Sequence, residues 1–304
     1  MDLENDEIIK DSLSKFNFRL GIQRFFELLE DNVENIKKAA EDGDIESNLR
    51  YGEILLNGEG VPPDKNEALR YFKYAADRGN AKAMFYYGKF EYEKEYKTGM
   101  EGNGLSYIRN AAKLGETEAM SYLGLLIITN KITATEGDDI VKYFQKAAEK
   151  EDPISMLHYG NMLLEGKIVT KDVEKGINYI KQSADLGNET ASLKYGLILY
   201  EGVEIPADKE KAILYIKKSA DQGNKDAIAR YIQILKNEDG IINKKQLSIY
   251  LKMMADLGDV DSMLEYGKIL LEDVNNEKRY ADCDKGYEAY EYFMFIIHCV
   301  HFIK

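Results

Sequence analysis

Small and apolar residues recur along this chain at a fixed step of 36 residues. The most regular marker is a glycine, which gives way to isoleucine once and is reached by a step of 35 at the end: Gly52, Gly88, Gly124, Gly160, Gly196, Ile232 and Gly267. The residue five positions before the marker is always alanine or serine, and the residue just before it is tyrosine except at Leu123. This spacing indicates an internal structural repeat.

A second series runs in phase with the first. A pair of small residues, Ala39-Ala40 in the first repeat, is followed three positions later by Gly43. The pattern recurs along the chain, and the closing glycine is replaced only by Glu151. Because two marker series share one period, the repeat is a unit of folding.

Each repeat predicts two helices joined by a short loop. The first helix ends at a glycine suited to a C-cap in three repeats, at Gly58, Gly166 and Gly202. The second helix begins at an aspartate suited to an N-cap in the same repeats, at Asp64, Asp172 and Asp208. One helix pair cannot bury its own apolar face, but stacked pairs can. The pattern therefore predicts an all-α, right-handed α–α superhelical solenoid of about seven 36-residue helix-pair repeats.

The repeats divide the chain into three expected parts. Residues 1–34 predict an N-terminal helical cap, residues 35–290 the repeats, and residues 291–304 an apolar C-terminal helix or capping segment. The apolar run 292–303 is shorter than the roughly 20 residues of a membrane-spanning helix, so we interpret it as a buried last helix, with a membrane anchor as the alternative. The third and fourth repeats have irregular segments at 91–104 and 128–139, where we expect the longest or most mobile loops.

The charge and the cysteine content limit the classes of partner and the cellular location that we expect for this chain. The chain has 41 Lys and Arg against 54 Asp and Glu, a net charge of −13. Binding to nucleic acid needs a positive surface, so nucleic acid is not an expected partner, and an anionic membrane is an unlikely one. The two cysteines, Cys283 and Cys299, do not make a disulfide framework. Since the N-terminal residues lack an apolar signal segment, we expect a cytoplasmic protein.

Candidate chemistry is sparse. His298, Cys299 and His301 could ligate zinc, but a structural zinc site needs four ligands and only Cys283 is near in sequence, so core packing is favoured. No spacing indicates a nucleophile with its base or a phosphate-binding loop. We therefore expect no cofactor, no metal and no enzymatic activity.

The repeat resembles the Sel1-like repeat, a relative of the tetratricopeptide repeat. Residues 47–82 and 191–226 match that pattern well: a small residue, an apolar residue before glycine, a glycine-rich loop, an aspartate, and a small pair before Gly-Asn. The resemblance covers about residues 35–290. The departures are tyrosine before the glycine, Ile232 and Glu151 in glycine positions, and the short last step.

The resemblance implies a role in binding. Proteins of this family are mostly adaptors that assemble complexes, in endoplasmic-reticulum-associated degradation, cell-wall synthesis and bacterial interaction with hosts. A bacterial subgroup with a cysteine pair in each repeat has been linked to penicillin binding, which suggests a hydrolase or small-molecule binder as an alternative. This chain lacks such pairs. A membrane-attached adaptor is the other alternative.

Positions that vary between repeats predict where a partner binds. Counted from the marker glycine, offsets −5, −1, +2 and +3 are nearly uniform and indicate packing, whereas offsets −2, +1 and +5 vary and share one face of the first helix. In helix-pair solenoids of this type the first helix lines the concave side, so we expect a partner peptide or domain there. The predicted contact residues are Arg50, Glu53, Tyr86, Lys89, Tyr122, Leu125, His158, Asn161, Lys194, Leu197 and Arg230.

Overall fold

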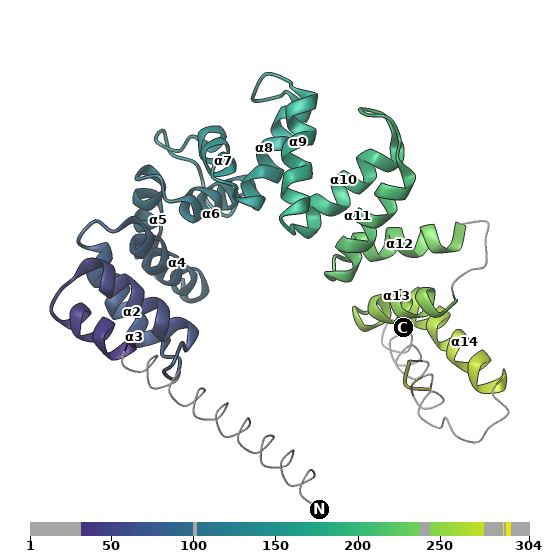
Figure 1. The fold of residues 1–304 in the computed structure, drawn as a ribbon, viewed down its shortest axis with the longest axis horizontal. Helices are drawn as coiled ribbons and strands as arrows, with labels where there is room; N and C mark the ends of the chain where they lie inside the picture. Colours follow the sequence, from purple (N-terminus) through teal and green to yellow (C-terminus); the bar gives the residue numbers. More distant parts are fainter. Residues whose placement is uncertain (1–31, 100–101, 238–243, 277–287, 289, 293–304) are drawn as a thin grey trace, which may run out of the picture. The chain divides into compact units, whose positions relative to one another are not determined.

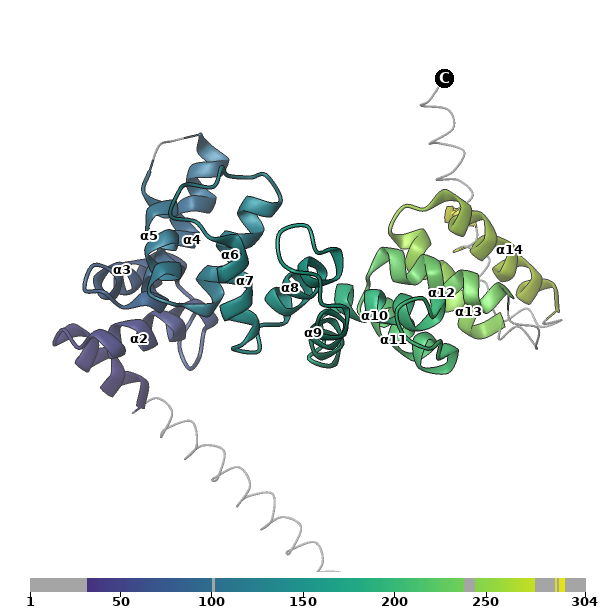
Figure 2. The ribbon, with the colours of Figure 1, turned by 90° about the horizontal axis from the view of Figure 1, so that it is seen from above.

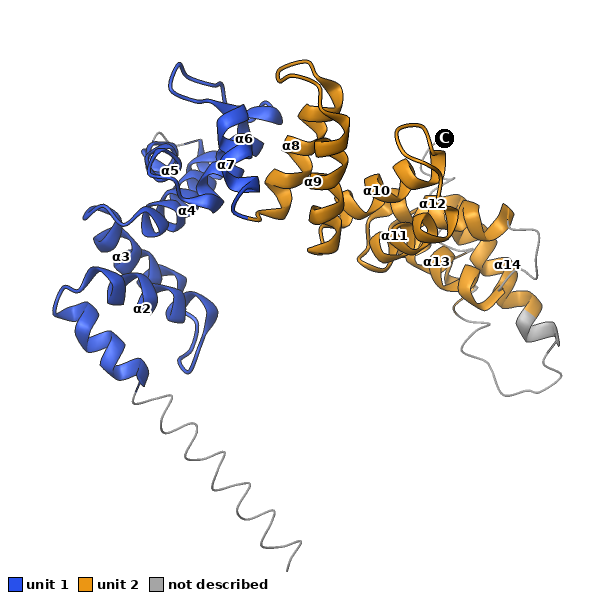
Figure 3. Cartoon of the chain, turned by 45° about the horizontal axis from the view of Figure 1, so that its top comes forward, with its two compact units in different colours: residues 1–150 blue, residues 151–304 orange. Residues whose placement is uncertain are grey.

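The computed structural model describes residues 32–99, 102–237, 244–276, 288 and 290–292. The described residues form helices, turns and loops without any strand, which confirms the all-α helix-pair fold (Figure 1). The chain divides into two compact units, Met1–Lys150 (unit 1) and Glu151–Lys304 (unit 2), coloured separately in Figure 3. Within the described residues, the helices are all too short or too polar to cross a membrane.

Unit 1 holds three of the expected repeats, preceded by a helical stretch at 32–41. Its helices are α2 (Ile45–Asn57), α3 (Lys65–Ala76), α4 (Ala81–Thr98), α5 (Gly104–Lys113), α6 (Thr117–Ile128) and α7 (Ile140–Ala148). Each helix contacts the next along the chain. Even-numbered helices are therefore the first helices of the repeats, and odd-numbered helices the second.

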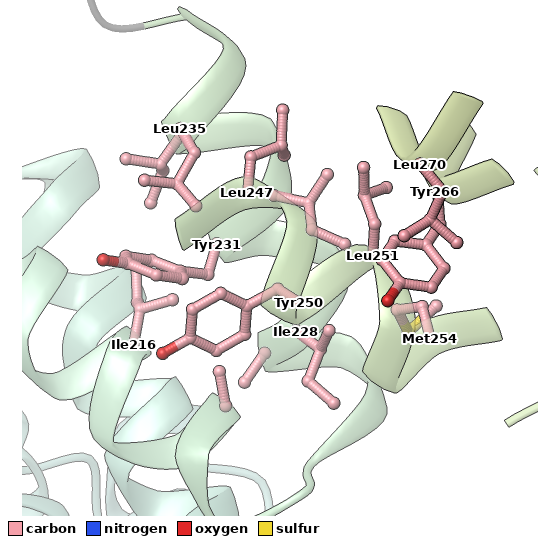
Figure 4. Packing of buried hydrophobic residues seen from close by; sticks show 14 residues of the cluster. Ile216, Ile228, Tyr231, Leu235, Leu247, Tyr250, Leu251, Met254, Tyr266 and Leu270 are labelled. Atoms are coloured by element: carbon pink, nitrogen blue, oxygen red, sulfur yellow. The ribbon is translucent and has the colours of Figure 1, made fainter. Parts of the chain in front are cut away.

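Unit 2 continues the same alternation. Its helices are α8 (Pro153–Glu165), α9 (Val173–Asp185), α10 (Glu189–Glu201), α11 (Lys209–Asp221), α12 (Lys225–Asn237), α13 (Lys244–Asp256) and α14 (Val260–Asn276). Figure 2 shows α8 beside α9 and α10 beside α11, the pairs in closest contact in this unit. Helices α11 to α14 share one hydrophobic core, and Figure 4 shows Ile216, Tyr231 and Tyr250 within it.

The marker glycine brings the two helices of a repeat together. A Cβ atom at Gly52 would lie 2.6 Å from the Phe72 ring, and one at Gly160 would lie 2.8 Å from the Gly176 carbonyl oxygen. At Gly52, Gly124, Gly160 and Gly196 the side chain 20 positions later lies against this space, whereas at Gly88 Tyr107 Cβ does. The residue 20 positions after each of these five glycines is fully buried: Phe72, Ile108, Phe144, Ile180 and Ile216. Close approach of the helices therefore depends on glycine on one helix and a large apolar residue on the other.

The helix caps match the expectation. The Asp64 carboxylate accepts a hydrogen bond from the Glu67 amide at 3.0 Å, and Asp172 and Asp208 cap α9 and α11 in the same way. These bonds satisfy amides that a helix N-terminus would otherwise leave unpaired. At the other end of the first helices, Gly58, Gly166 and Gly202 adopt left-handed backbone conformations.

The described residues of the two irregular segments differ in structure. In the α4–α5 repeat, α4 runs to Thr98, so most of the expected loop at 91–104 is helix, and Gly99 ends it with a φ of 67°. The loop at 128–139 is long, but a buried carboxylate holds it. Asp138 accepts hydrogen bonds from the Thr135 amide and hydroxyl, each at 2.9 Å, and from Arg109 Nε at 3.0 Å. The loop is thus as long as expected, and the sequence pattern gave no sign of this ion pair.

Tyrosines link successive repeats. Inside a repeat, the tyrosine before the marker glycine meets a tyrosine of the second helix edge to face, as in Tyr195 and Tyr215, whose ring centroids are 4.8 Å apart. The hydroxyl of the second tyrosine then donates to an aspartate at the end of the preceding second helix, as in Tyr215 to Asp185 at 2.6 Å. The bond recurs three times: Tyr107 to Asp77, Tyr250 to Asp221 and Tyr292 to Asp256. We call these four bonds the tyrosine–aspartate ladder.

Glu151 occupies the closing turn where the other repeats have glycine. Its φ is 62°, in the left-handed region, and Gly115 and Gly187 at the equivalent positions have φ values of 89° and 96°. A side chain in that region is strained by its Cβ atom. The turn geometry of the repeat thus persists although the residue type does not.

Glu151→Gly is expected to raise the free energy of unfolding by about 1 kcal/mol, because it removes this strain at a modest cost in chain entropy. Urea unfolding followed by circular dichroism measures it. The matched control is Glu149→Gly two residues earlier, where φ is −64° and glycine should lower stability. A fall in stability for both variants would contradict the strain argument.

Several expected features lie outside the described residues. They are nearly all of the cap at 1–34, the residues 293–304 of the C-terminal segment, and the four residues of the zinc hypothesis, Cys283, His298, Cys299 and His301. The division into cap, repeats and C-terminal segment stays a prediction.

Candidate functional site

The predicted contact residues lie on the first helices, and each unit carries its own set. In unit 1 they are Arg50 and Glu53 on α2, Tyr86 and Lys89 on α4, and Tyr122 and Leu125 on α6. In unit 2 they are His158 and Asn161 on α8, Lys194 and Leu197 on α10, and Arg230 on α12. Arg50 is exposed and the others are partly buried. None of them is fully enclosed in the core, so each retains some surface for a partner.

The unit 1 face is aromatic. Tyr86 stacks on the buried Phe72, with ring centroids 4.9 Å apart and an interplanar angle of 29°. Tyr122 meets the buried Phe85 edge to face at 5.8 Å. Burial raises the pKa of the Tyr122 phenol to about 12. Both tyrosines thus rest on the core by one side and stay partly open on the other, which combines the packing and binding interpretations of these positions.

Charged groups surround these rings. The Lys82 ammonium lies 5.7 Å from the centre of Tyr86 and bonds to Glu53 at 2.8 Å, and the Lys89 ammonium lies 5.4 Å from the centre of Tyr122. Arg50 pairs with Glu59 at 2.8 Å. The face therefore has an apolar centre and a charged rim, as protein interfaces commonly do.

The unit 2 face is polar. Burial lowers the pKa of His158 and also that of Lys194, since both lose hydration. Arg230 donates to Gln233 at 3.2 Å and stacks on the Tyr200 ring, with its guanidinium carbon 4.9 Å from the ring centre. Sequence reasoning did not single out Tyr200, although it lies four residues after the marker Gly196 on the same helix.

Two of these residues carry a buried polar atom with no hydrogen-bond partner. They are Asn161, through its side-chain oxygen, and Arg230, through Nε. Buried polar atoms are nearly always paired, so each exception calls for an explanation. Both atoms lie on residues that the repeat pattern assigned to partner contact.

A cavity of about 820 Å³ lies beside α9, and none of its lining residues is a predicted contact residue. Its charged lining comprises Asp172, Glu174, Lys175, Lys181 and Glu204. Asp172 is occupied as the cap of α9 and Lys181 pairs with Asp185 at 2.8 Å. The described part of the chain also holds no cluster of three His, Cys, Asp or Glu residues suited to a metal ion.

Comparison with known proteins identifies the repeat. The family model described as the Sel1 repeat matches residues 45–80, 141–152, 153–188 and 190–224. No curated protein matches the chain.

Two solved structures share the fold. The c5321 protein, a protective antigen of uropathogenic Escherichia coli that displays an SLR fold, is 24% identical with a TM-score of 0.57, and the match covers 86% of this chain and 55% of the antigen. This chain therefore spans about half of that antigen's length. A Sel1 repeat protein from Oxalobacter formigenes is 22% identical with a TM-score of 0.61, and the match covers 75% of this chain and 99% of that protein.

Proposed function

We propose that this chain, a Sel1-like helical repeat protein, is a non-catalytic scaffold that binds a peptide or domain of another protein on the exposed face of its first helices. Sel1 repeat proteins generally act as scaffolds for protein–protein interaction. The proposal concerns the surface that this chain uses and the residues that make the contact. It places the protein in the cytoplasm, in keeping with its two cysteines.

The aromatic face of unit 1 is the observation that supports the proposal best. Tyr86 and Tyr122 are anchored on Phe72 and Phe85, so their rings are held in place before a partner arrives. A preorganised side chain loses less entropy on binding than a free one. Tyrosine is among the residues that contribute most binding energy at protein interfaces. The two rings are therefore suited to act as the anchors of an interface.

Tyr86→Ala and Tyr122→Ala are each expected to weaken partner binding by about 2 kcal/mol, or roughly thirtyfold, because anchor residues at an interface commonly contribute that much. The measurement is affinity capture from cell extract with the full chain as bait, in which mass spectrometry compares the amount of each captured protein between variant and wild type.

The matched control is Tyr96→Ala on α4, since Tyr96 is a 69% exposed tyrosine of the same helix that the proposal leaves outside the face. Circular dichroism must show folded variants. A captured set that is unchanged in folded Tyr86→Ala and Tyr122→Ala proteins, or reduced equally by Tyr96→Ala, would show that partners bind elsewhere.

A further inference from the structure

Three polar groups on the first-helix face of unit 2 have no partner within the described part of the chain. The side-chain oxygen of Asn161 and Nε of Arg230 are buried without a hydrogen bond. The ammonium of Lys194 is partly buried and makes no hydrogen bond or ion pair there either, although burial disfavours its charged form. Lys194 has only the charge of Glu165 to offset its lost hydration, and the Arg230 guanidinium keeps its bond to Gln233 and its contact with Tyr200 while its Nε stays without a hydrogen bond.

The three helices that carry these groups present one surface. Lys194 on α10 interacts electrostatically with His158 and Glu165 of α8. On the other side of α10, Tyr200 and Leu197 pack against the α12 core, and the Arg230 guanidinium lies over Tyr200. Asn161, Lys194 and Arg230 hence lie on successive first helices of unit 2, and Leu197 lies three residues after Lys194 on α10.

The chemistry of these groups indicates which kind of ligand could pair with them. Lys194 and Arg230 offer donors with positive charge, which a carboxylate satisfies best. The Asn161 oxygen needs an N–H donor, and a peptide backbone supplies one at every residue except proline. Leu197 offers an apolar contact. A segment that carries carboxylates, amide N–H groups and an apolar side chain is an acidic peptide.

We propose that the first-helix face of unit 2 binds an extended acidic peptide segment of a partner protein. Its carboxylates contact Lys194 and Arg230, and one of its backbone N–H groups donates to the Asn161 side-chain oxygen. This inference rests on the proposed scaffold function and adds the chemistry of the partner.

Nucleic acid is a poorer occupant of the same face. Glu165 and Glu201, both exposed, lie on α8 and α10 one and two turns beyond the polar groups. They repel a uniformly charged polyanion, whereas a peptide can place its acidic residues at Lys194 and Arg230 only. The net charge of −13 acts in the same direction.

The test begins with a displayed library of random peptides about twelve residues long, selected against the full chain. Synthetic labelled copies of the selected peptides are then measured by fluorescence anisotropy. Selected peptides are expected to contain Asp or Glu, and replacement of these by Asn or Gln is expected to weaken binding about tenfold or more, because hydrogen bonds between charged groups are lost.

Two variants remove the groups without creating a cavity. Lys194→Met and Asn161→Leu are each expected to weaken binding of the selected peptides about tenfold while the urea midpoint stays the same or rises, because neither change removes a hydrogen bond within the described part of the free protein. The control is Lys225→Ala, which removes an exposed lysine of α12 and should change neither binding nor the midpoint.

The outcomes separate this inference from the scaffold function. Selected peptides without acidic residues, or acidic peptides that bind Lys194→Met and Asn161→Leu as tightly as wild type, would overturn the inference and leave the scaffold function standing. Failure of the full chain both to select any peptide and to capture any protein would overturn both. A lower urea midpoint with unchanged peptide binding would assign Lys194 and Asn161 a structural role instead.

Discussion

Gly160→Leu is expected to lower the free energy of unfolding of unit 2 by about 3 kcal/mol or more. Leucine favours the helix over glycine by about 1 kcal/mol, so helix propensity alone would raise the free energy of unfolding. Packing between the helices outweighs this preference, because a Cβ at this position would lie 2.8 Å from both the Gly176 carbonyl oxygen and Ile180 Cγ1. A backbone oxygen cannot move aside without shifting α9, so a larger side chain forces the two helices apart.

Urea unfolding measured by circular dichroism tests this expectation. Thr190→Leu on α10 is the matched control, since Thr190 is exposed and the change should stay within about 0.5 kcal/mol of wild type. A Gly160→Leu protein as stable as wild type would mean that α8 and α9 do not approach as closely as described. Because repeat arrays can unfold in parts, the midpoint and the steepness of the transition are both needed.

Asp138→Ala is expected to destabilise unit 1 by about 3 kcal/mol, because removing one member of a buried ion pair leaves the other charge without compensation. The Asp138 side chain is fully buried and that of Arg109 is 19% exposed. Burial alone would raise the pKa of Asp138, but the Thr135 hydrogen bonds and the Arg109 guanidinium outweigh it and hold the pKa below its ordinary value. The carboxylate is therefore stabilised in its charged form.

Two further measurements identify the cause. Glu59→Ala removes a carboxylate that pairs with Arg50 at the surface, where both side chains are about half exposed, and should cost less than about 1 kcal/mol. The pKa of Asp138 is lower in the folded than in the unfolded state, so its contribution is present above the unfolded pKa of about 3.9 and is lost as the pH falls through the folded value. The difference between wild type and Asp138→Ala should accordingly shrink in acid, and a difference that persists unchanged would point to lost packing instead.

Most of the fold could be predicted from the 36-residue period. Helix boundaries, caps and the close approach at the marker glycine follow from residues that recur every 36 positions, because one geometry is required in each repeat. The period also tolerates exceptions. Glu151 takes the left-handed conformation without being glycine, and Ile232 stays 6% exposed in a glycine position, in one core with Leu251. The period alone could not give the energetic cost of either departure.

Features that occur only once in the chain could not be predicted from the repeat pattern. The Asp138–Arg109 pair joins residues 29 positions apart in an irregular loop, and nothing in the local sequence marks them as partners. The buried residues opposite the marker glycines could have been found, since the residue 20 positions after each of the first five marker glycines is Phe or Ile. The contact residues remain a prediction. Variation between repeats identified positions outside the uniform core, although several of them still pack on it, as Tyr86 does on Phe72. It says nothing about what a partner offers, and the unpaired atoms of Asn161 and Arg230 add that information.

The tyrosine–aspartate ladder has a consequence for how such a chain can grow over evolutionary time. Each bond joins a donor in one repeat to an acceptor in the repeat before it, as Tyr215 does with Asp185. A repeat such as the one that contains α11 carries both halves of a junction, since Tyr215 bonds to the preceding repeat and Asp221 accepts a bond from the following one. A gene duplication that inserts 36 codons within the array would reproduce both halves in register. New copies would join the array without a specially adapted junction, and lineages could lengthen or shorten the binding surface while each remaining contact stays as it was.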